Sequence, residues 1–572
     1  MSRSLPTRGG RIGGPDRCMA RSGDPAPGSI AGPAALLGVA LLAMALRVHQ
    51  SRLPAGNSSR LLLISHGSAA SLLSGWLPDP AQVAAGVAAA ILLGGSAAIR
   101  WRGGQLLRVG ALGRARRAGG RDLRTLRRGR RAQVAAEPRV RLGDHHFRSL
   151  WLPSGEHLLA LGPTGSGKTS ALAIPALLEW PGPVVVTDPK GELVQSTAPF
   201  RSTLGEVAVF APLMEPSARW NPIAAIRSSE DSLRVATFLM GRAPEREPFW
   251  HDLARQLLHG LLVEASDRGL APEAVLELLQ ATPAEELPAA VQHPVARRLV
   301  QGALSGGDRT SMGVVATLIS QLGAYGTDQV ARATSSSDFD PAEIAGGELK
   351  TLYCVVAPHD APVLRGLISA LISCCWRSIF ANPPATPVLF VLDEFTQLTN
   401  LPELPALVQL GRSQGVRMML MAQDLGSITA AYGVEAAGAL WSNCRTKLLL
   451  PGISEIELLE RVSKLAGSAT LHRRSDTWIG EPVSAQPLLH PDDVRRLRSQ
   501  QSLLLRGSDQ PAIIDQHQWF RDRALVARAK TGVPFRGPAP AAGRPLRDWT
   551  DPDPVWAASD HPLPWNPADV KA

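Results

Sequence analysis

Eight consecutive residues, GPTGSGKT, have the types and spacing of a phosphate-binding loop. They fit the pattern G-x-x-x-x-G-K-[ST], in which glycines let backbone N–H groups fold around a phosphate. The Lys168 ammonium can reach the β- and γ-phosphates of a nucleotide, and the Thr169 hydroxyl can bind Mg²⁺. The expected nucleotide contacts are Gly162, Pro163, Thr164, Gly165, Ser166, Gly167, Lys168 and Thr169. The apolar run HLLAL before the loop and the helix-like SALAIPALLEW after it favour this interpretation over a chance glycine-rich turn.

A second apolar run ends in two carboxylates. The sequence PVLFVLDEF is typical of a buried parallel strand that meets its loop at Asp393 and Glu394. Asp393 is expected to hold Mg²⁺ through water, and Glu394 to take a proton from the attacking water. Together with the earlier loop, this acidic pair predicts ATP hydrolysis with Mg²⁺ rather than nucleotide binding alone.

The elements that must position these residues alternate along the chain. Further strand-like runs cover residues 183–188, 206–210, 351–356, 416–423, 445–450 and 501–507. Helix-like segments lie between them, so we predict an α/β fold with a doubly wound, mostly parallel sheet. Residues 226–335 contain no strand-like run and have apolar residues at helical spacing, which predicts an all-helical insertion.

Composition restricts the class of protein. The 572 residues are 45% hydrophobic and 19% charged, which excludes a disordered chain and a polytopic transporter. The net charge of +10 is concentrated between Arg100 and Arg141, where 14 arginines stand against two acidic residues. The remainder is nearly neutral, so the overall charge is a poor argument for a DNA-coated surface. Five cysteines without C-x-x-C spacing exclude a disulfide framework or a zinc ribbon and indicate a reducing compartment.

Two uncharged stretches, residues 30–46 and 81–99, have the length of membrane-spanning helices. Arginines flank both on the side expected to be cytoplasmic. A secretory signal peptide is the alternative for the first stretch. The Arg-rich segment that follows either contacts anionic lipid or binds nucleic acid, and the absence of aromatic residues between Trp101 and Phe147 favours lipid.

The resulting organisation has six parts. They are a cytoplasmic N-terminus (1–29), a transmembrane hairpin with a short external loop (30–99), an Arg-rich juxtamembrane linker (100–149), a motor domain in two pieces (150–225 and 336–530), the all-helical insertion (226–335) and a Pro-rich disordered tail (531–572). The tail carries Trp549, Trp556 and Trp565, which either form a docking motif or pack back onto the core.

Several ordered blocks between about Leu150 and Arg523 resemble the type IV secretion coupling proteins, the TraG/TraD-like conjugative DNA transfer ATPases. The blocks are the P-loop with the following VVVTDPKGEL, ARWNPI, the helical insertion opening with FW, VLDEFTQLTNLPELPALVQLGRSQGVRMMLMAQ and PLLHPDDVRRL. The resemblance implies a RecA-like motor, an inner-membrane anchor with the motor in the cytoplasm, and a homo-hexameric ring. It also implies single-stranded DNA bound to a relaxase, or protein substrates, as cargo for the channel components of a type IV secretion system.

The resemblance assigns roles to two further residues. Gln423 matches the sensor of the γ-phosphate, and Arg412 matches an arginine that reaches the nucleotide of a neighbouring subunit. A polar strand end is the alternative for Gln423, and a surface cation at a helix end is the alternative for Arg412. Asp188 and Lys190, in DPKGE, belong either to the site or to an exposed turn.

The leading prediction is a membrane-anchored ATPase that drives DNA or protein into a conjugation channel. An FtsK-like double-stranded DNA translocase is a related alternative, disfavoured because only two spanning stretches and no separate DNA-reading module are found. A receptor that binds nucleotide without hydrolysing it is the alternative of another class, disfavoured by the intact Lys168, Thr169, Asp393 and Glu394.

Overall fold

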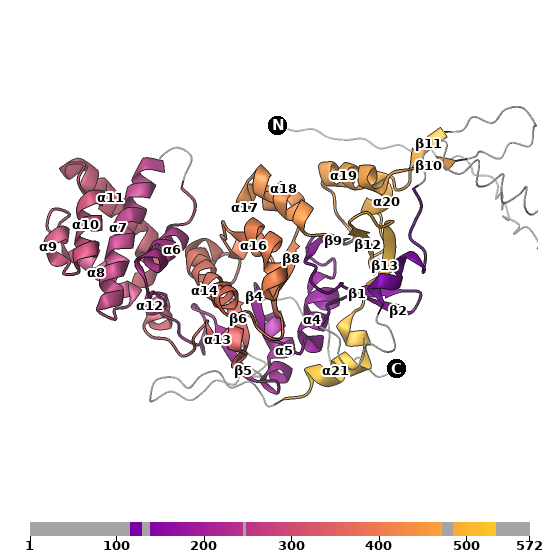
Figure 1. Ribbon diagram of the computed structural model, residues 1–572, viewed down its shortest axis with the longest axis horizontal. Helices are drawn as coiled ribbons and strands as arrows, with labels where there is room; N and C mark the ends of the chain where they lie inside the picture. Colours follow the sequence, from indigo (N-terminus) through magenta and orange to yellow (C-terminus); the bar gives the residue numbers. More distant parts are fainter. Residues whose placement is uncertain (1–114, 128–137, 244–247, 472–483, 533–572) are drawn as a thin grey trace, which may run out of the picture. The chain divides into compact units, whose positions relative to one another are not determined.

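An eleven-stranded sheet forms the centre of the protein. The structure is a computed structural model and describes residues 115–127, 138–243, 248–471 and 484–532. The strand order is β2-β1-β13-β12-β9-β3-β8-β7-β4-β6-β5 (Figure 1). Seven neighbouring strands, from β9 to β5, are parallel: β3 (Leu158–Leu161), β4 (Val184–Asp188), β5 (Glu206–Phe210), β6 (Leu349–Val355), β7 (Val388–Leu392), β8 (Val416–Ala422) and β9 (Thr446–Leu449). Each lies within or overlaps a predicted run, so the mostly parallel sheet is confirmed.

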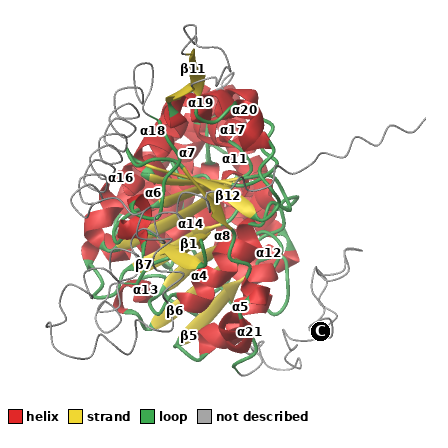
Figure 2. Ribbon diagram, turned by 90° about the vertical axis from the view of Figure 1, so that its right-hand side faces the viewer, coloured by secondary structure: helices red, strands yellow, loops and turns green. Residues whose placement is uncertain are grey.

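Both faces of the parallel sheet are covered by helices. Alternate strand residues enter two separate cores: Leu159 and Leu161 of β3 lie in one, and Leu158 and Ala160 in the other. The helix α14 (Ala361–Ala381) packs on the first face, and α4 (Ile174–Glu179) and α5 (Glu192–Ser202) pack on the second. Figure 2 shows the strands enclosed by helices. This two-sided burial explains why the strands read as continuous apolar runs.

Four antiparallel strands extend one edge of the sheet. They are β12 (Gln501–Arg506), β13 (Ala512–Asp515), β1 (Arg141–His145) and β2 (Arg148–Trp151). Only β12 is predicted from the sequence, because the others are four or five residues long and their burial is incomplete. The sheet therefore begins at Arg141, ahead of the motor boundary expected at residue 150. Before it, the short helix η1 (Asp122–Leu126) buries two leucines.

Helices occupy the chain between β5 and β6. They are α6 (Ser229–Met240), α7 (Pro248–Asp267), α8 (Pro272–Ala281), α9 (Leu287–Ala290), α10 (Pro294–Ala303), α11 (Asp308–Leu322), η4 (Gly323–Gly326), α12 (Asp328–Thr334) and α13 (Glu343–Gly346). No strand interrupts the described residues of 226–335. The helices α10 and α11 both pack on α7, and α6 contacts both α7 and α14. The contact of α6 with α14 connects this helical segment to the sheet.

Shorter helices follow β7 and complete the fold. They are α15 (Phe395–Leu398), α16 (Leu404–Leu410), η5 (Gly411–Gln414), α17 (Leu425–Tyr432), α18 (Val434–Asn443), α19 (Ile456–Ala466), α20 (Pro491–Arg495), η6 (Trp519–Arg521) and α21 (Arg523–Ala529). A separate two-stranded ribbon pairs β10 (Ser468–Leu471) with β11 (Ser484–Pro487).

One helix in the described part of the chain, α14, is long and apolar enough to cross a membrane. Most of its residues are buried against the sheet, as expected for a core helix. The predicted N-terminus and transmembrane hairpin lie outside the described residues, as do residues 100–114 and 128–137 of the linker and residues 533–572 of the tail.

Arg201 ties α5 to the sheet from a fully buried position. Its Nε donates to Thr351 Oγ1 at 2.9 Å, and its Nη2 donates to the Gly182 carbonyl at 2.7 Å. A third bond joins Nη1 to the Trp180 carbonyl. Burial lowers the pKa of Arg201 to about 10, so the guanidinium is still charged at neutral pH.

Replacing Arg201 by methionine is expected to lower the free energy of unfolding by about 3 kcal/mol, because buried acceptors lose their donor. The midpoint of urea unfolding measures this loss. The exposed Arg298→Met variant serves as the matched control and should unfold like the wild type. Equal midpoints for the two variants would show that the bonds of Arg201 do not stabilise the fold.

Candidate nucleotide-binding site

The glycine-rich loop leaves the carboxyl end of a central strand and leads into a helix. β3 ends at Leu161, and residues 162–168 connect it to a π-helical turn, η3 (Thr169–Ala173), which continues as α4. Gly165 and Gly167 have φ angles of +79° and +98°, which strongly favour glycine. The spacing of the motif is therefore required by the backbone path of this loop.

The Lys168 side chain lies inside the loop and is only 5% exposed. Its Nζ donates to the carbonyl of Gly162 and, at 3.3 Å, to that of Pro163. It also lies 3.5 Å from Glu394 Oε1. A buried ammonium surrounded by loop carbonyls and one carboxylate is placed to bind an incoming phosphate.

Asp393 follows β7 directly and faces the start of the loop helix. The Thr169 hydroxyl donates to Asp393 Oδ2 at 3.3 Å. The other oxygen, Oδ1, is buried and has no hydrogen-bond partner among the described residues. Burial, and secondarily the charge of Glu394, raises the pKa of Asp393 to about 7. The unpartnered oxygen and the Thr169 hydroxyl fit Mg²⁺, which binds few protein oxygens and keeps waters or phosphate oxygens as its other ligands.

Glu394 has a strained backbone. Its φ and ψ are +48° and +41°, in the left-handed region that residues other than glycine rarely adopt. Such a conformation costs about 1–3 kcal/mol and persists where surrounding structure enforces it, often at functional sites. The turn directs the Glu394 side chain, which is 14% exposed, toward Lys168.

Gln423 lies beside the first residue of the loop. β8 runs parallel to β3, with Ala422 opposite Leu161, and the Gly162 N–H donates to the Ala422 carbonyl at 3.2 Å. Gln423 follows Ala422 directly and is partly exposed. The structure therefore brings Gln423 to the carboxyl ends of the parallel strands, where Lys168 also lies.

Arg412 lies at the opposite end of β8. It belongs to η5, which precedes the strand, and its side chain is exposed. The seven residues of β8 span about 23 Å, at roughly 3.3 Å per residue. The Arg412 side chain instead lies against Gly155, ahead of β3, where a Cβ atom would come within 2.7 Å of Arg412 Nε. Arg412 is thus the one predicted site residue that the structure does not bring to the loop.

Asp188 is buried, so the exposed turn considered for it is wrong. Its carboxylate accepts the backbone N–H groups of Val194, at 2.9 Å, and Lys190, at 3.2 Å, near the start of α5. Burial raises the pKa of Asp188 to about 6. The Lys190 side chain is exposed. Asp188 thus stabilises the beginning of α5 behind the candidate site.

Sequence reasoning missed Gln516, which contacts the loop from outside. Its Nε2 donates to the Ser166 carbonyl at 3.0 Å. Gln516 follows the short strand β13, far along the chain from the loop, and no local motif surrounds it. Only the pairing of β13 with β1 and β12 brings it to this position.

Comparison with known proteins places these features in a family. The family model described as Type IV secretory system Conjugative DNA transfer matches residues 122–536. The conjugal transfer protein TraG of Escherichia coli is 27% identical over 458 residues, covering 68% of this chain and 71% of TraG. Protein VirD4 of Rhizobium rhizogenes is 26% identical over 408 residues, covering 66% of this chain. This chain therefore covers 60% of the length of VirD4.

The fold is shared with a solved coupling protein. The plasmid coupling protein TrwB, solved in complex with ADP and Mg²⁺, superimposes with a TM-score of 0.57 at 20% identity. The similarity covers 73% of this chain and 97% of TrwB. It confirms the predicted α/β, RecA-like fold of the motor.

Proposed function

Because the chain belongs to the family of type IV secretory system conjugative DNA transfer proteins, we propose that it is an ATPase that drives substrates into a type IV secretion channel. The observation that carries this proposal is the convergence of Lys168, Thr169, Asp393 and Glu394 at the carboxyl ends of β3 and β7. Hydrolysis requires a group that takes a proton from the attacking water, and a carboxylate beside the phosphate-binding lysine supplies one, whereas binding alone does not require it.

In this proposal, different residues bind the phosphates, activate the attacking water and hold the metal ion. The loop amides and the Lys168 ammonium bind the β- and γ-phosphates, and Gln423 contacts the γ-phosphate from the neighbouring strand. Glu394 orients the attacking water and takes its proton. Thr169 and Asp393 would hold Mg²⁺, which neutralises charge on the phosphate oxygens when it is bound.

The proposal extends to the assembly, location and cargo that the family resemblance implies. The protein acts as a homo-hexameric ring at the bacterial inner membrane, anchored by the two N-terminal apolar stretches. Its cargo is single-stranded DNA with its relaxase, or a protein, and the ring grips the polymer largely without reading its sequence. Arg412 completes the site of the neighbouring subunit, which is supported by its exposure and its distance from its own loop.

Replacing Lys168 by alanine tests the proposal. Loss of one preorganised charge at the phosphates is expected to lower the rate of ATP hydrolysis by about 10²–10³-fold. Substrate transfer between cells should stop, whereas the variant should still reach the membrane. Purified full-length protein is used for the hydrolysis assay, and a mating assay measures transfer.

The exposed Lys190 provides the matched control, since Lys190→Ala removes a lysine close to the site without entering the loop. It should hydrolyse ATP and support transfer like the wild type. Wild-type transfer by the Lys168→Ala variant would contradict a motor driven by this site. Stimulation of hydrolysis by double-stranded rather than single-stranded DNA would favour the FtsK-like alternative.

A further inference from the structure

Three consecutive residues near the end of the described chain lie against the phosphate-binding loop. They are Gln516, His517 and Gln518, which we call the strap, and they connect β13 to η6. Their backbone is held at one end by a hydrogen bond from the Gln516 N–H to the Gln500 carbonyl, at 2.7 Å. The strap thus belongs to the antiparallel edge of the sheet while touching the nucleotide site.

Gln516 contacts one particular peptide group of the loop. Its Nε2 donates to the Ser166 carbonyl, and its Oε1 accepts from Gln518 Nε2 at 3.0 Å. Gly167 lies against the same side chain, since a Cβ atom there would come within 2.3 Å of Gln516 Oε1. The glycine is therefore required for this contact as well as for its φ of +98°.

The geometry of a peptide bond gives this contact a consequence for phosphate binding. In a trans peptide the C=O and the following N–H point in opposite directions. The bond between Ser166 and Gly167 is trans. The hydrogen bond from Gln516 therefore fixes the plane of the Ser166–Gly167 peptide, and with it the direction of the Gly167 N–H. That N–H is one of the backbone donors expected to surround the phosphate.

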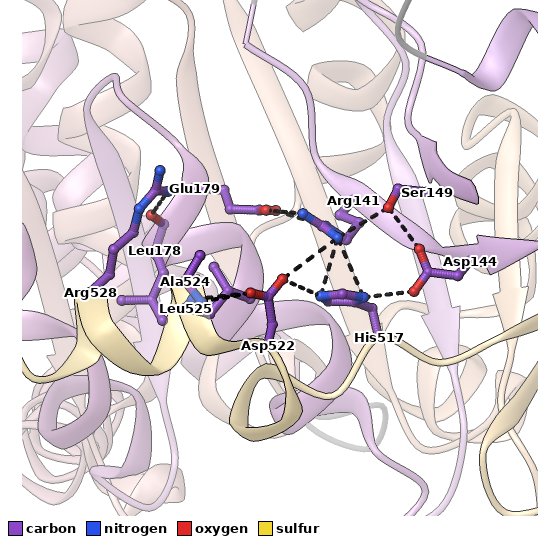
Figure 3. Close-up of polar contacts among 10 residues, drawn as sticks. All are labelled: Arg141, Asp144, Ser149, Leu178, Glu179, His517, Asp522, Ala524, Leu525 and Arg528. Carbon is purple, nitrogen blue, oxygen red and sulfur yellow. Dashed lines mark hydrogen bonds and ion pairs between the residues drawn. The ribbon is translucent and has the colours of Figure 1, made fainter. Parts of the chain in front are cut away.

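The middle residue of the strap is held by two carboxylates. His517 Nδ1 lies 2.7 Å from Asp144 Oδ2 of β1, and Nε2 lies 2.9 Å from Asp522 Oδ2 (Figure 3). Arg141 Nη1 lies 3.1 Å from His517 Nε2, and the same guanidinium pairs with Glu179 at the end of α4. His517 is mostly buried. The cluster therefore connects the strap both to the edge strand and to the helix that follows the loop.

We propose that the strap is a positioning device for the phosphate-binding loop, in which Gln516 orients the Gly167 amide and His517 fixes Gln516 in place. This inference rests on the proposed function, because it concerns the affinity of the same loop for ATP. Gln516 is a positioning residue, since it acts on the nucleotide through the loop backbone.

The charge of His517 makes the strap sensitive to pH. An imidazole can donate to both Asp144 and Asp522 only when both of its nitrogens carry a proton. The hydrogen bond to Asp144 raises the pKa of His517, against the opposing effects of burial and of Arg141. With Arg141 positive and Asp144, Asp522 and Glu179 negative, protonation of His517 brings the cluster closer to neutrality. A raised pKa means that the contribution of His517 is complete at low pH and is lost as pH rises through that pKa.

Binding of ATP to variants of Gln516 tests the first half of the inference. Gln516→Ala removes the donor, and Gln516→Glu keeps the size of the side chain but replaces the donor with a negative charge. Loss of one hydrogen bond is expected to weaken ATP binding about threefold to tenfold in Gln516→Ala, and repulsion of the phosphates should weaken it further in Gln516→Glu. KM should rise while kcat changes little, because the amide contacts the phosphate in the ground state and in the transition state alike.

The exposed Gln500 provides the matched control, because its side chain bonds Arg521 on the same edge of the sheet without touching the loop. Gln500→Ala should bind ATP like the wild type. Thermal unfolding of each variant shows whether the fold is intact. Equal ATP affinity for the wild type, Gln516→Ala and Gln516→Glu would overturn the role of Gln516.

The second half is tested with His517→Gln, which can donate to one carboxylate only and does not titrate. Full-length wild type and variant are titrated with ATP and Mg²⁺ between pH 5.5 and 9, chosen as roughly the range in which a histidine ionises. Dividing the wild-type affinity by the variant affinity at each pH cancels the pH dependence that comes from the nucleotide and from the other site residues. The advantage of the wild type should be largest at low pH and should shrink as pH rises.

The outcomes separate the two proposals. A ratio that does not change with pH would overturn the role of His517. A wild-type protein that binds no nucleotide at any pH would contradict the proposed function, and the strap could then have no effect on nucleotide binding. A wild type that binds ATP, with strap variants that bind it equally well, would leave the proposed function intact and reject the strap.

Discussion

Replacing Arg412 by alanine is expected to lower ATP hydrolysis by about 10³–10⁵-fold while ATP binding is retained, if the arginine acts on a neighbouring subunit. The physical reason is its position. Arg412 is exposed and precedes β8, whereas the loop lies beyond the carboxyl ends of the strands. An arginine that cannot reach its own nucleotide can stabilise transition-state charge only in another subunit. Hydrolysis by the purified protein, at concentrations that span ring assembly, measures the effect.

Mixing two inactive variants tests whether sites are shared between subunits. In a mixture of Arg412→Ala and Glu394→Gln, some interfaces combine an intact Glu394 with an intact Arg412 from the neighbour. Activity should then exceed that of either variant alone. The half-exposed Arg255→Ala, on α7, is the matched control and should hydrolyse ATP normally. No recovery in the mixture would contradict a role for Arg412 across the interface.

Replacing Glu394 by glutamine is expected to lower ATP hydrolysis by about 10²–10⁴-fold, because the amide cannot take the proton of the attacking water. Affinity for ATP should change little, since Lys168 and the loop backbone are untouched. The 3.5 Å contact between Lys168 and Glu394 shows that the carboxylate lies within the site. Single-turnover hydrolysis and equilibrium ATP binding, measured on the same preparation, separate the two effects.

Glu435, exposed on α18, provides the matched control as Glu435→Gln. If the wild type hydrolyses ATP no faster than Glu394→Gln, with and without single-stranded DNA, a receptor that uses nucleotide only for assembly becomes the better description. In that case the strained backbone of Glu394 would need another explanation.

The parallel strands and the loop were predictable because their causes are local. A strand that is buried on both faces is expected to be apolar along its length, and β7 is, as is β8 apart from Arg417. The phosphate-binding loop needs glycines at fixed positions because φ is positive at Gly165 and Gly167. The pairing of loop and acidic strand end predicted a shared site, and the structure places Thr169 within 3.3 Å of Asp393.

The edge strands were not predictable from their own residues. β1, β2 and β13 are short, and the β1–β2 hairpin joins the sheet only through a strand far away in the chain, by the pairing of Asp144 with Asp515. The contact between β1 and β13 lies outside any window of sequence that a periodicity argument can use. The burial of Asp188 depends instead on how α5 begins after β4, a local turn whose path periodicity does not describe.

By itself, the sequence determined which residues are proposed to bind phosphate and metal, since they form eight contiguous residues and one acidic strand end. The tertiary structure decided which distant residues lie near them. It brings Gln423 to the loop, keeps Arg412 at the other end of the same strand, and places Gln516 against the Ser166 carbonyl. Local backbone geometry follows from residue type, whereas the meeting of distant segments depends on how the whole sheet is assembled.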